Sequence, residues 1–124
     1  YEIDKKGKPI KLENPQIDEL IATVQNTERE FADQEIVERM MIALCLESVR
    51  CLEDGIVATA IEADMALVLG LGFPPFRGGP LRYLDSLGLA QFCKLAGKYE
   101  DLGAIYTVTD KLRQMSDNGA SFYR

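Results

Sequence analysis

The sequence predicts an all-α protein, folded as a compact bundle of about five or six helices. Apolar residues recur at intervals of three and four along several segments, which is the period of a helix with one buried face. Capping residues or prolines precede these segments, and glycines follow them. No long segment alternates as a strand does, with residues 105–108 the one doubtful patch. The 124 residues are 47% hydrophobic, enough for one core.

The N-terminal part of the chain is predicted to lack a packed element. Residues 1–13 are polar and rich in lysine, which indicates an extended linker ahead of a helical domain over residues 14–124. Asn14 is typical of a helix N-cap, and Pro15 suits the first helical position. Apolar residues at helical spacing then predict a short amphipathic helix to about Gln25.

The second predicted helix is the longest. Asp33 is expected to cap its start and Gly55 to end it. Its apolar residues form one broad stripe, which predicts a place at the centre of the core. The stripe consists of Ile36, Val37, Met40, Met41, Leu44, Cys45, Val49 and Leu52. Charged residues on the remaining face are left for solvent or a partner.

Two helices are predicted on either side of a loop rich in glycine and proline. Thr59 and Glu62 form an S/T-x-x-E capping box ahead of an apolar run, and Gly70 is expected to close that helix in a left-handed C-cap. Beyond the loop, Pro80 is predicted at the first position of the next helix, which Gly88 ends.

Two further helices complete the predicted bundle. One runs from about Leu89 to Lys98, and the last runs from a Thr109 cap to Asn118. Both carry apolar residues at helical spacing, and an aromatic tail follows the last one.

Residues 70–80 read G-L-G-F-P-P-F-R-G-G-P and are predicted to form a rigid corner between helices. Gly70 and Gly72 match the start of a G-x-G-x-x-G phosphate loop, but Pro75 stands where the third glycine is needed, and the preceding segment is helical. Proline also has no N–H with which to bind an anion. An extended P-x-x-P ligand is excluded because the adjacent prolines lie between two helix caps.

Three side chains of this corner have predicted roles. Phe73 and Phe76 are expected to pack between helices. Arg77 carries the charge of the loop, and the favoured interpretation is that it pairs with a local carboxylate such as Asp85 or bonds helix-end carbonyls. The alternative is that Arg77 holds a ligand or a partner, because a firmly fixed loop can build a contact surface.

Composition excludes several classes of function. The net charge of −6 and the pI near 4.7 disfavour nucleic acid and anionic membranes as partners. Apolar runs too short to span a bilayer and the lack of a signal-peptide pattern lead us to expect a cytoplasmic protein. The sequence has no histidine and no C-x-x-C, which disfavours Ser-His and Cys-His nucleophiles, zinc sites and disulfide frameworks. We therefore expect no catalytic, cofactor-binding or metal-binding residue in this chain.

One set of motifs carries a resemblance to a known family. The segment E-A-D-M-A-L-V-L-G-L-G-F-P-P-F-R-G-G-P-L-R-Y-L-D-S-L-G resembles the C-terminal helical domain of 3-hydroxyacyl-CoA dehydrogenases, whose pattern is Asp, G-x-G-aromatic-Pro, Gly-Pro, then Asp and Gly. The forms G-F-P-P-F-R-G-G, R-C-L-E-D-G and N-G-A-S-F-Y are most similar to alpha subunits of bacterial fatty-acid oxidation complexes. The resulting structural or interface loop comprises Asp64, Gly70, Gly72, Phe73, Pro74, Pro75, Phe76, Arg77, Gly78, Gly79, Pro80, Asp85 and Gly88.

The resemblance implies that the chain is one piece of a multifunctional enzyme of fatty-acid beta-oxidation. Such a parent combines an enoyl-CoA hydratase/isomerase region, with lyase and isomerase activities, an NAD-binding dehydrogenase domain and two helical repeats, of which this is the second. NAD and 3-hydroxyacyl-CoA are then the cofactor and the substrate of the parent oxidoreductase. A thiolase beta subunit is a further implied partner.

The resemblance also implies a supporting role for this repeat. The leading helix of a catalytic repeat reads I-V-N-R, whereas Glu38 stands at the Asn position here, which indicates a non-catalytic repeat. Two such repeats resemble the dimer of single-domain relatives, so this one is expected to pack on the first repeat, beside the NAD-binding domain. The candidate contact residues are Glu38, Met40, Met41 and Leu44. An equally weighted interpretation places the three apolar ones in the core.

Three other functions remain open at this point. The chain could be an acyl-CoA or CoA-binding module in which Arg77 and Arg82 hold phosphates, with Lys94, Lys98 and Lys111 as a local basic patch. It could be the dimerising C-terminal domain of a monofunctional dehydrogenase. The third is an unrelated helical interaction domain, for which the loop match would be a coincidence.

Overall fold

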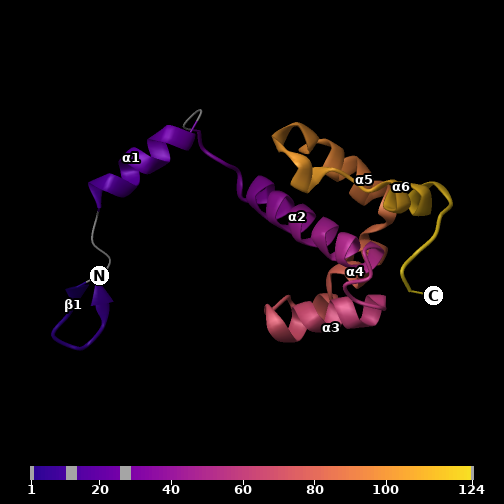
Figure 1. Cartoon of the computed structure of the whole chain (residues 1–124), viewed down its shortest axis with the longest axis horizontal. Coiled ribbons are helices and arrows are strands. Elements are labelled where there is room, and N and C mark those ends of the chain that lie inside the picture. The colour runs from indigo at the N-terminus through magenta and orange to yellow at the C-terminus, as the bar shows by residue number, and fades with distance from the viewer. Residues whose placement is uncertain (1, 11–13, 26–28, 124) are drawn as a thin grey trace. The chain divides into compact units, whose positions relative to one another are not determined.

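A computed structural model of the chain describes residues 2–10, 14–25 and 29–123 (Figure 1). Contacts between residues divide the chain into two compact units, Tyr1–Phe31 and Ala32–Arg124. The second unit is helical, and the described residues contain six α-helices and one two-stranded sheet, so the predicted all-α class is confirmed.

The first unit begins with a small hairpin inside the segment predicted as a linker. Strands β1 (Glu2–Ile3) and β2 (Pro9–Ile10) pair in antiparallel register. The side chain of Asp4 closes the turn, because its Oδ1 accepts hydrogen bonds from the backbone N–H groups of Lys6 and Lys8, each at 2.8 Å. Such aspartate turns are local and need no core. The prediction of an extended linker over residues 1–13 did not include this hairpin.

Helix α1 (Pro15–Val24) completes the first unit. Asn14 caps it by accepting a hydrogen bond from the N–H of Gln16 at 3.1 Å, and Pro15 occupies the first turn, as predicted. All of its large apolar side chains are exposed, namely Ile17, Leu20, Ile21 and Val24. The domain boundary after residue 13 stays a prediction, although the contacts group this helix with the residues before it.

Helix α2 (Asp33–Glu53) is the central helix of the second unit. It contacts α3, α4, α5 and the 3₁₀ helix η3, and it buries Ile42, Cys45, Leu46, Ser48 and Val49. Its N-cap is Ala32, which makes no side-chain cap, so the prediction that Asp33 caps the helix is wrong. Asp33 is the first helical residue instead, where its negative charge interacts favourably with the positive N-terminal end of the helix dipole. Gly55, with φ of 71°, follows its end as predicted.

The remaining helices surround α2 in the predicted order. They are α3 (Ala60–Gly70), α4 (Pro80–Leu87), α5 (Leu89–Gly97), the short 3₁₀ helices η2 (Glu100–Leu102) and η3 (Ala104–Tyr106), and α6 (Asp110–Asp117). The doubtful patch at residues 105–108 therefore contains the end of η3 and no strand. Figure 1 shows α3, in pink, at the lower edge of this unit, and α5 and α6, in orange and yellow, toward its upper edge.

Local capping explains where α3 and α6 begin. The hydroxyl of Thr59 accepts the N–H of Glu62 at 3.2 Å, and the Glu62 carboxylate accepts the N–H of Ala58 at 2.8 Å. The hydroxyl of Thr109 accepts the N–H of Leu112 in the same way at 3.2 Å. Both predicted caps are confirmed, because each depends on residues that are close in sequence.

The core of the second unit joins all of its α-helices. Its buried members are Ile42, Cys45, Leu46, Val49, Ala63, Leu81, Leu84, Leu89, Phe92, Ala96, Tyr106, Val108 and Leu112. Within the described part of the chain, no helix combines the length and the apolar composition needed to cross a membrane.

Candidate functional site

The corner between α3 and α4 is a tight turn, but its glycines act at other positions than predicted. Gly70 is the last residue of α3, so the prediction of a left-handed cap at this residue is wrong. The positive φ, 72°, belongs to Gly72. The N–H groups of Leu71 and Phe73 both donate to the carbonyl of Leu67, at 3.1 and 3.0 Å. The chain therefore reverses two residues later than the sequence pattern indicates.

Asp64, on α3, caps the N-terminus of α4 with its carboxylate. It is 2% exposed, and its two oxygens accept the backbone N–H groups of Leu81 at 2.7 Å and Arg82 at 3.0 Å. Both N–H groups lie in the first turn of α4, where a helix offers them no internal partner. Pro80 has no N–H, and the N-cap residue Gly79 has no side chain. The cap therefore comes from a different helix, and its charge faces the positive end of the α4 dipole.

Gly79 is the point at which the corner backbone approaches Asp64 most closely. Its φ is 115°, which L side chains rarely adopt. A Cβ atom at this position would lie 2.3 Å from the Cβ and Cγ atoms of Asp64. Glycine is thus required here by backbone conformation and by space. Gly78 is similar, because its φ is 77° and its Cβ would lie 2.9 Å from the Cγ of Arg82.

The C-terminal tail bonds to the same two helices. The Tyr123 hydroxyl donates to Oδ2 of Asp64 at 2.6 Å. On α4, the Asp85 carboxylate accepts the backbone N–H groups of Phe122 at 2.9 Å and Tyr123 at 2.8 Å. The Arg82 guanidinium lies 3.7 Å from the centre of the Tyr123 ring, a cation–π contact. We refer to Asp64, Gly79, Arg82, Asp85 and Tyr123 as the corner network.

Tyr123 is the member of the corner network whose pKa is shifted. Burial raises the pKa of the Tyr123 phenol, and the hydrogen bond to the Asp64 carboxylate raises it further. Tyr123 therefore stays a neutral donor at physiological pH. Among the described residues, no buried side-chain nitrogen or oxygen lacks a hydrogen-bond partner. A fully bonded network of this kind stiffens a fold.

The side chains of the corner only partly follow the predictions. Phe73 is buried, as predicted, but Phe76 is 85% exposed, so its predicted packing between helices is wrong. The Arg77 guanidinium lies 4.9 Å from the centre of the Tyr83 ring. It forms no ion pair with Asp85 among the described residues, because the tail amides occupy that carboxylate. The predicted Arg77–Asp85 pair is therefore wrong.

Sequence reasoning missed the role of Tyr123. In the sequence this residue belongs only to an aromatic tail, whereas its hydroxyl reaches Asp64, which is 59 residues away. The one local signal is the aromatic pair Phe122-Tyr123, a few residues after α6 ends at Asp117. The CoA-binding hypothesis uses Arg82 as a phosphate ligand, but the Arg82 guanidinium lies over the Tyr123 ring.

A second polar cluster surrounds Glu38 on α2. Its carboxylate accepts hydrogen bonds from the Tyr99 hydroxyl at 2.7 Å and from Nε2 of Gln34 at 2.8 Å. The bond from Tyr99 is the main reason that the pKa of Glu38 is lowered, and the same bond raises the pKa of Tyr99 to about 12. Glu38 is therefore ionised at neutral pH and bonded within its own unit.

Comparison with known proteins identifies relatives over almost the whole chain. One relative is "Fatty acid oxidation complex subunit alpha" of Pseudomonas paraeruginosa. This chain is 58% identical to it over 123 residues, which is 99% of the chain. The proteins of the same name from Pseudomonas syringae pv. syringae and Pseudomonas entomophila are 58% and 56% identical over the same share. The chain is similar to the C-terminal part of these alpha subunits. It spans 17% of their length, and no protein-family model matches it.

The predicted contact residues have different surroundings. Met40 is 69% exposed, whereas Met41 is half-buried and packs against the core. Leu44 is half-buried and lines a groove between α2 and α3. The contact of these residues with another repeat of an alpha subunit stays a prediction. The core interpretation fits Met41 and does not fit Met40.

The corner does not fit the NAD that the resemblance implies for a parent enzyme. A dinucleotide phosphate needs free N–H groups at a helix N-terminus. At α4 those of Leu81 and Arg82 are bonded to Asp64, whose negative charge would repel a phosphate. In the described residues, Gly72 of this G-x-G thus serves chain reversal, and Gly70 ends α3.

Proposed function

We propose that this chain is a non-catalytic helical repeat that supports the dehydrogenase site of a fatty acid oxidation complex alpha subunit. It packs on a first helical repeat as a pseudo-dimer and lies beside the NAD-binding domain. The parent oxidises 3-hydroxyacyl-CoA with NAD and carries enoyl-CoA hydratase/isomerase activity, while this chain alone is inactive. In this proposal the parent acts in the bacterial cytoplasm, with a thiolase beta subunit as a further partner.

The bonding of Asp64 is the observation that carries this proposal. Asp64 is the only carboxylate buried in the described core, and all three of its hydrogen bonds hold parts of this unit together. Asp85 is likewise occupied by two backbone N–H groups of the tail. The acidic residues of the motif that resembles dehydrogenases are therefore used for structure. A scaffold explains them, and proton transfer to a substrate is not needed.

A scaffold can raise activity without touching the substrate. Catalytic groups need placement within fractions of an ångström, and supporting contacts from a rigid neighbour supply it. The corner network joins α3, α4 and the tail by hydrogen bonds between residues far apart in sequence, so these elements are cross-linked. In this proposal, the rigid chain stabilises the conformation of the first helical repeat and of the NAD-binding domain.

A complementation experiment tests the proposal. The Pseudomonas paraeruginosa alpha subunit is produced without the segment that matches this chain, and this chain is titrated into it. We expect a one-to-one complex by size-exclusion chromatography with light scattering, and a rise in NADH consumption with a 3-ketoacyl-CoA. The absence of a complex together with unchanged activity would rule the supporting role out.

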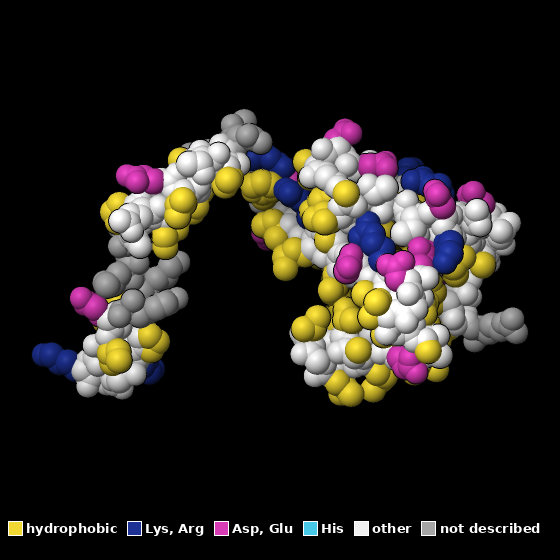
Figure 2. Space-filling view, in the orientation of Figure 1, with side chains coloured by type: hydrophobic (Ala, Val, Ile, Leu, Met, Phe, Trp, Pro, Cys, Tyr) yellow, Lys and Arg dark blue, Asp and Glu magenta, His cyan; other side chains and the backbone are white. Residues whose placement is uncertain are grey.

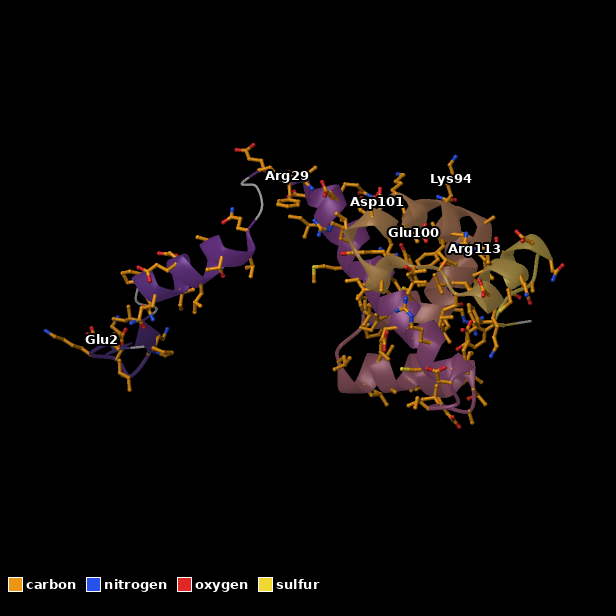
Figure 3. All side chains as sticks on the ribbon, turned by 45° about the horizontal axis from the view of Figure 1, so that its top comes forward. Glu2, Arg29, Lys94, Glu100, Asp101 and Arg113 are labelled. Atoms are coloured by element: carbon orange, nitrogen blue, oxygen red, sulfur yellow. The ribbon has the colours of Figure 1, made fainter. Side chains whose placement is uncertain are left out.

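A CoA-binding module is a second candidate, favoured by one feature of the surface. Lys94 and Lys98 line a hollow of about 540 Å³ along α5, and Figure 3 shows Lys94 pointing outward from that helix. The other predicted phosphate ligands are engaged elsewhere, because Arg77 and Arg82 stack on aromatic rings and Lys111 reaches a backbone carbonyl of α2.

Calorimetry separates the two candidates. Titration of CoA into this chain is compared with titration into the variant Lys94→Ala/Lys98→Ala. Micromolar binding that the variant loses would favour the CoA-binding module. No heat with either protein is what the supporting role predicts, and the same variant should complement the truncated alpha subunit as well as the unchanged chain does.

A further inference from the structure

Helix α6 leads into the exposed dipeptide Asn118-Gly119. Asparagine is one of the chemically labile residues of proteins. The backbone nitrogen of the next residue can attack the carbon of its side-chain amide, so that a new N–C bond forms, the C–NH₂ bond breaks and ammonia leaves. Water then opens the five-membered imide ring, and the product is aspartate or isoaspartate. Water is the only co-reactant in this deamidation.

The residue that follows an asparagine decides how readily the ring closes. Glycine is the most favourable, because it has no side chain to block the attack and its backbone is the least restricted. The chain has three asparagines. Asn14 precedes Pro15, whose nitrogen has no hydrogen to lose, and Asn26 precedes the β-branched Thr27. Asn118 is therefore the asparagine at which the sequence favours deamidation.

The folded turn after α6 holds this dipeptide in a geometry that does not allow the attack. The N–H of Gly119 donates to the carbonyl of Ser116 at 3.2 Å, and that of Ala120 donates to the carbonyl of Met115 at 2.9 Å. These are the two bonds of a Schellman motif, with Gly119 at a φ of 63°. Ring closure needs the Gly119 nitrogen to be eclipsed with Cβ of Asn118. At the observed ψ of 0° it is eclipsed with the backbone nitrogen of Asn118 instead, so the turn must open before the reaction.

Local opening brings the reacting groups within reach of each other. Asn118 and Gly119 are exposed, and among the described residues the Asn118 side-chain amide has no hydrogen-bond partner that would hold it. Exposed turns with few buried contacts open at a lower free energy than the core. When a turn opens and closes faster than the chemical step, the rate of that step follows the population of the open form. The fold therefore sets the rate of deamidation at Asn118.

The products of the reaction disturb the tail that follows. Isoaspartate carries the main chain through the former side chain, which lengthens the chain by one methylene group. This extra group lies between α6 and the backbone N–H groups of Phe122 and Tyr123, which bond to Asp85. Both products also add a negative charge beside Asp117, at the end of α6 where the helix dipole is itself negative. Both changes act against the placement of Tyr123, whose hydroxyl bonds to Asp64.

We propose that Asn118 is a modification site at which the chain deamidates in water, that the capping turn of α6 keeps this reaction slow, and that the product loosens the tail from the corner network. The inference does not depend on the proposed supporting function, because it concerns a reaction of the chain with water alone. It assigns a chemical consequence to the N-G-A-S-F-Y segment, which so far serves only as a mark of resemblance.

Mass spectrometry tests the site and its protection. The chain and the peptide M-S-D-N-G-A-S, residues 115–121, are kept in the same mildly alkaline buffer. Deamidation is detected by the change in mass, and isoaspartate is detected by enzymatic methylation. We expect modification of Asn118 and none of Asn14. The folded chain should react at least about tenfold more slowly than the peptide, because only the open turn reacts.

Hydrogen exchange tests the effect on the tail. The modified chain is separated from the unmodified chain by ion exchange, since it carries one more negative charge. We expect the amides of Phe122 and Tyr123 to exchange at least about threefold faster in the modified chain, and those of α2 to change by less than about twofold. The variant Asn118→Ser, aged in the same way, cannot form the imide ring. It is the control for other chemical damage and should keep its initial exchange rates.

Three results would overturn the proposal. The first is an Asn118 that stays unmodified in both the chain and the peptide. The second is an equal rate in the two, which would show that the turn gives no protection. The third is unchanged exchange of the Phe122 and Tyr123 amides after modification, which would separate the reaction from the corner network. None of these results would bear on the complementation of the truncated alpha subunit, so the proposed function is tested independently.

Discussion

The two faces of α3 are built in opposite ways. The face toward α4 buries a carboxylate, Asp64, and satisfies it with three hydrogen bonds. The face away from the core exposes Ile61, Met65 and Leu69, and Figure 2 shows hydrophobic side chains gathered along the lower edge of the second unit, where α3 lies. A buried polar group and an exposed apolar row are the two departures from ordinary burial that carry information. The first is explained within this chain, since Asp64 caps α4, whereas no contact within the described residues buries the second.

This difference indicates which substitutions should affect folding and which should not. Changes in the corner network should lower the free energy of unfolding, because the network has no spare bond. Changes of the exposed row Ile61, Met65 and Leu69 should leave folding almost intact. Four predictions test this division, from the largest expected effect to the smallest.

Gly79→Ala should have the largest effect. The new Cβ would collide with Asp64, and φ of 115° is unfavourable for alanine. We expect the free energy of unfolding, measured by urea denaturation, to fall by at least about 4 kcal/mol, or the protein not to fold. Gly97→Ala is the matched control, because a Cβ there meets no atom within 4 Å, and it should change stability by less than about 1 kcal/mol. Equal stability of the two variants would contradict the proposed clash.

Asp64→Asn should have the next largest effect. It keeps the size of the side chain but replaces one acceptor oxygen by an NH₂ donor, which then faces donors of α4 or of Tyr123. We expect a loss of about 2–3 kcal/mol in urea denaturation, since a buried donor is left unpaired. In a double-mutant cycle with Tyr123→Phe, the two losses should be less than additive. Strict additivity would mean that the hydroxyl and the carboxylate do not interact.

The tyrosines should make stability fall at alkaline pH. The pKa of Tyr123 is raised in the folded state by burial first and by Asp64 second, and that of Tyr99 is raised from 10.0 to about 12 by its bond to Glu38. A group with a raised folded pKa contributes its full stability below the unfolded pKa of about 10 and loses it as pH rises toward the folded value.

Alkaline unfolding of the single variants separates the two contributions. The fall in urea midpoint between pH 9 and pH 11 should become shallower in Tyr123→Phe and, separately, in Tyr99→Phe. Gly97→Ala, which removes no phenol, is the control, and it should keep the slope of the unchanged chain. A slope in Tyr123→Phe equal to that of the unchanged chain would show that this phenol gains no protection on folding.

Met65→Ser/Leu69→Ser should change stability least. Both side chains are about half or more exposed, so their removal opens no cavity. We expect the urea midpoint to correspond to a change of less than about 0.5 kcal/mol. A loss of more than about 2 kcal/mol would mean that the row is part of this unit's own core, and the contrast between the two faces of α3 would disappear.

Sequence reasoning succeeded where structure depends on near neighbours. Asn14 and Thr59 cap helices through N–H groups two and three residues away, and Pro80 begins α4 because its fixed φ suits that position. The spacing of apolar residues at intervals of three and four also located the central helix α2, because this spacing depends only on residues within the helix itself. The aspartate turn at Asp4 is equally local, but its two-residue strands are too short to produce a recognisable alternation.

Tertiary structure decided everything that joins distant residues. Phe73 and Phe76 look alike in the sequence, yet Phe73 is buried and Phe76, in the short 3₁₀ helix Pro75–Arg77, is 85% exposed. The hydrogen-bond partners of Asp64 are 17, 18 and 59 residues away in the sequence, and no local sequence pattern indicates such pairs. The apolar row of α3 was visible as helical periodicity, but periodicity does not say which face meets the core. Only the packing of α3 on α2 and α4 showed that this row faces outward.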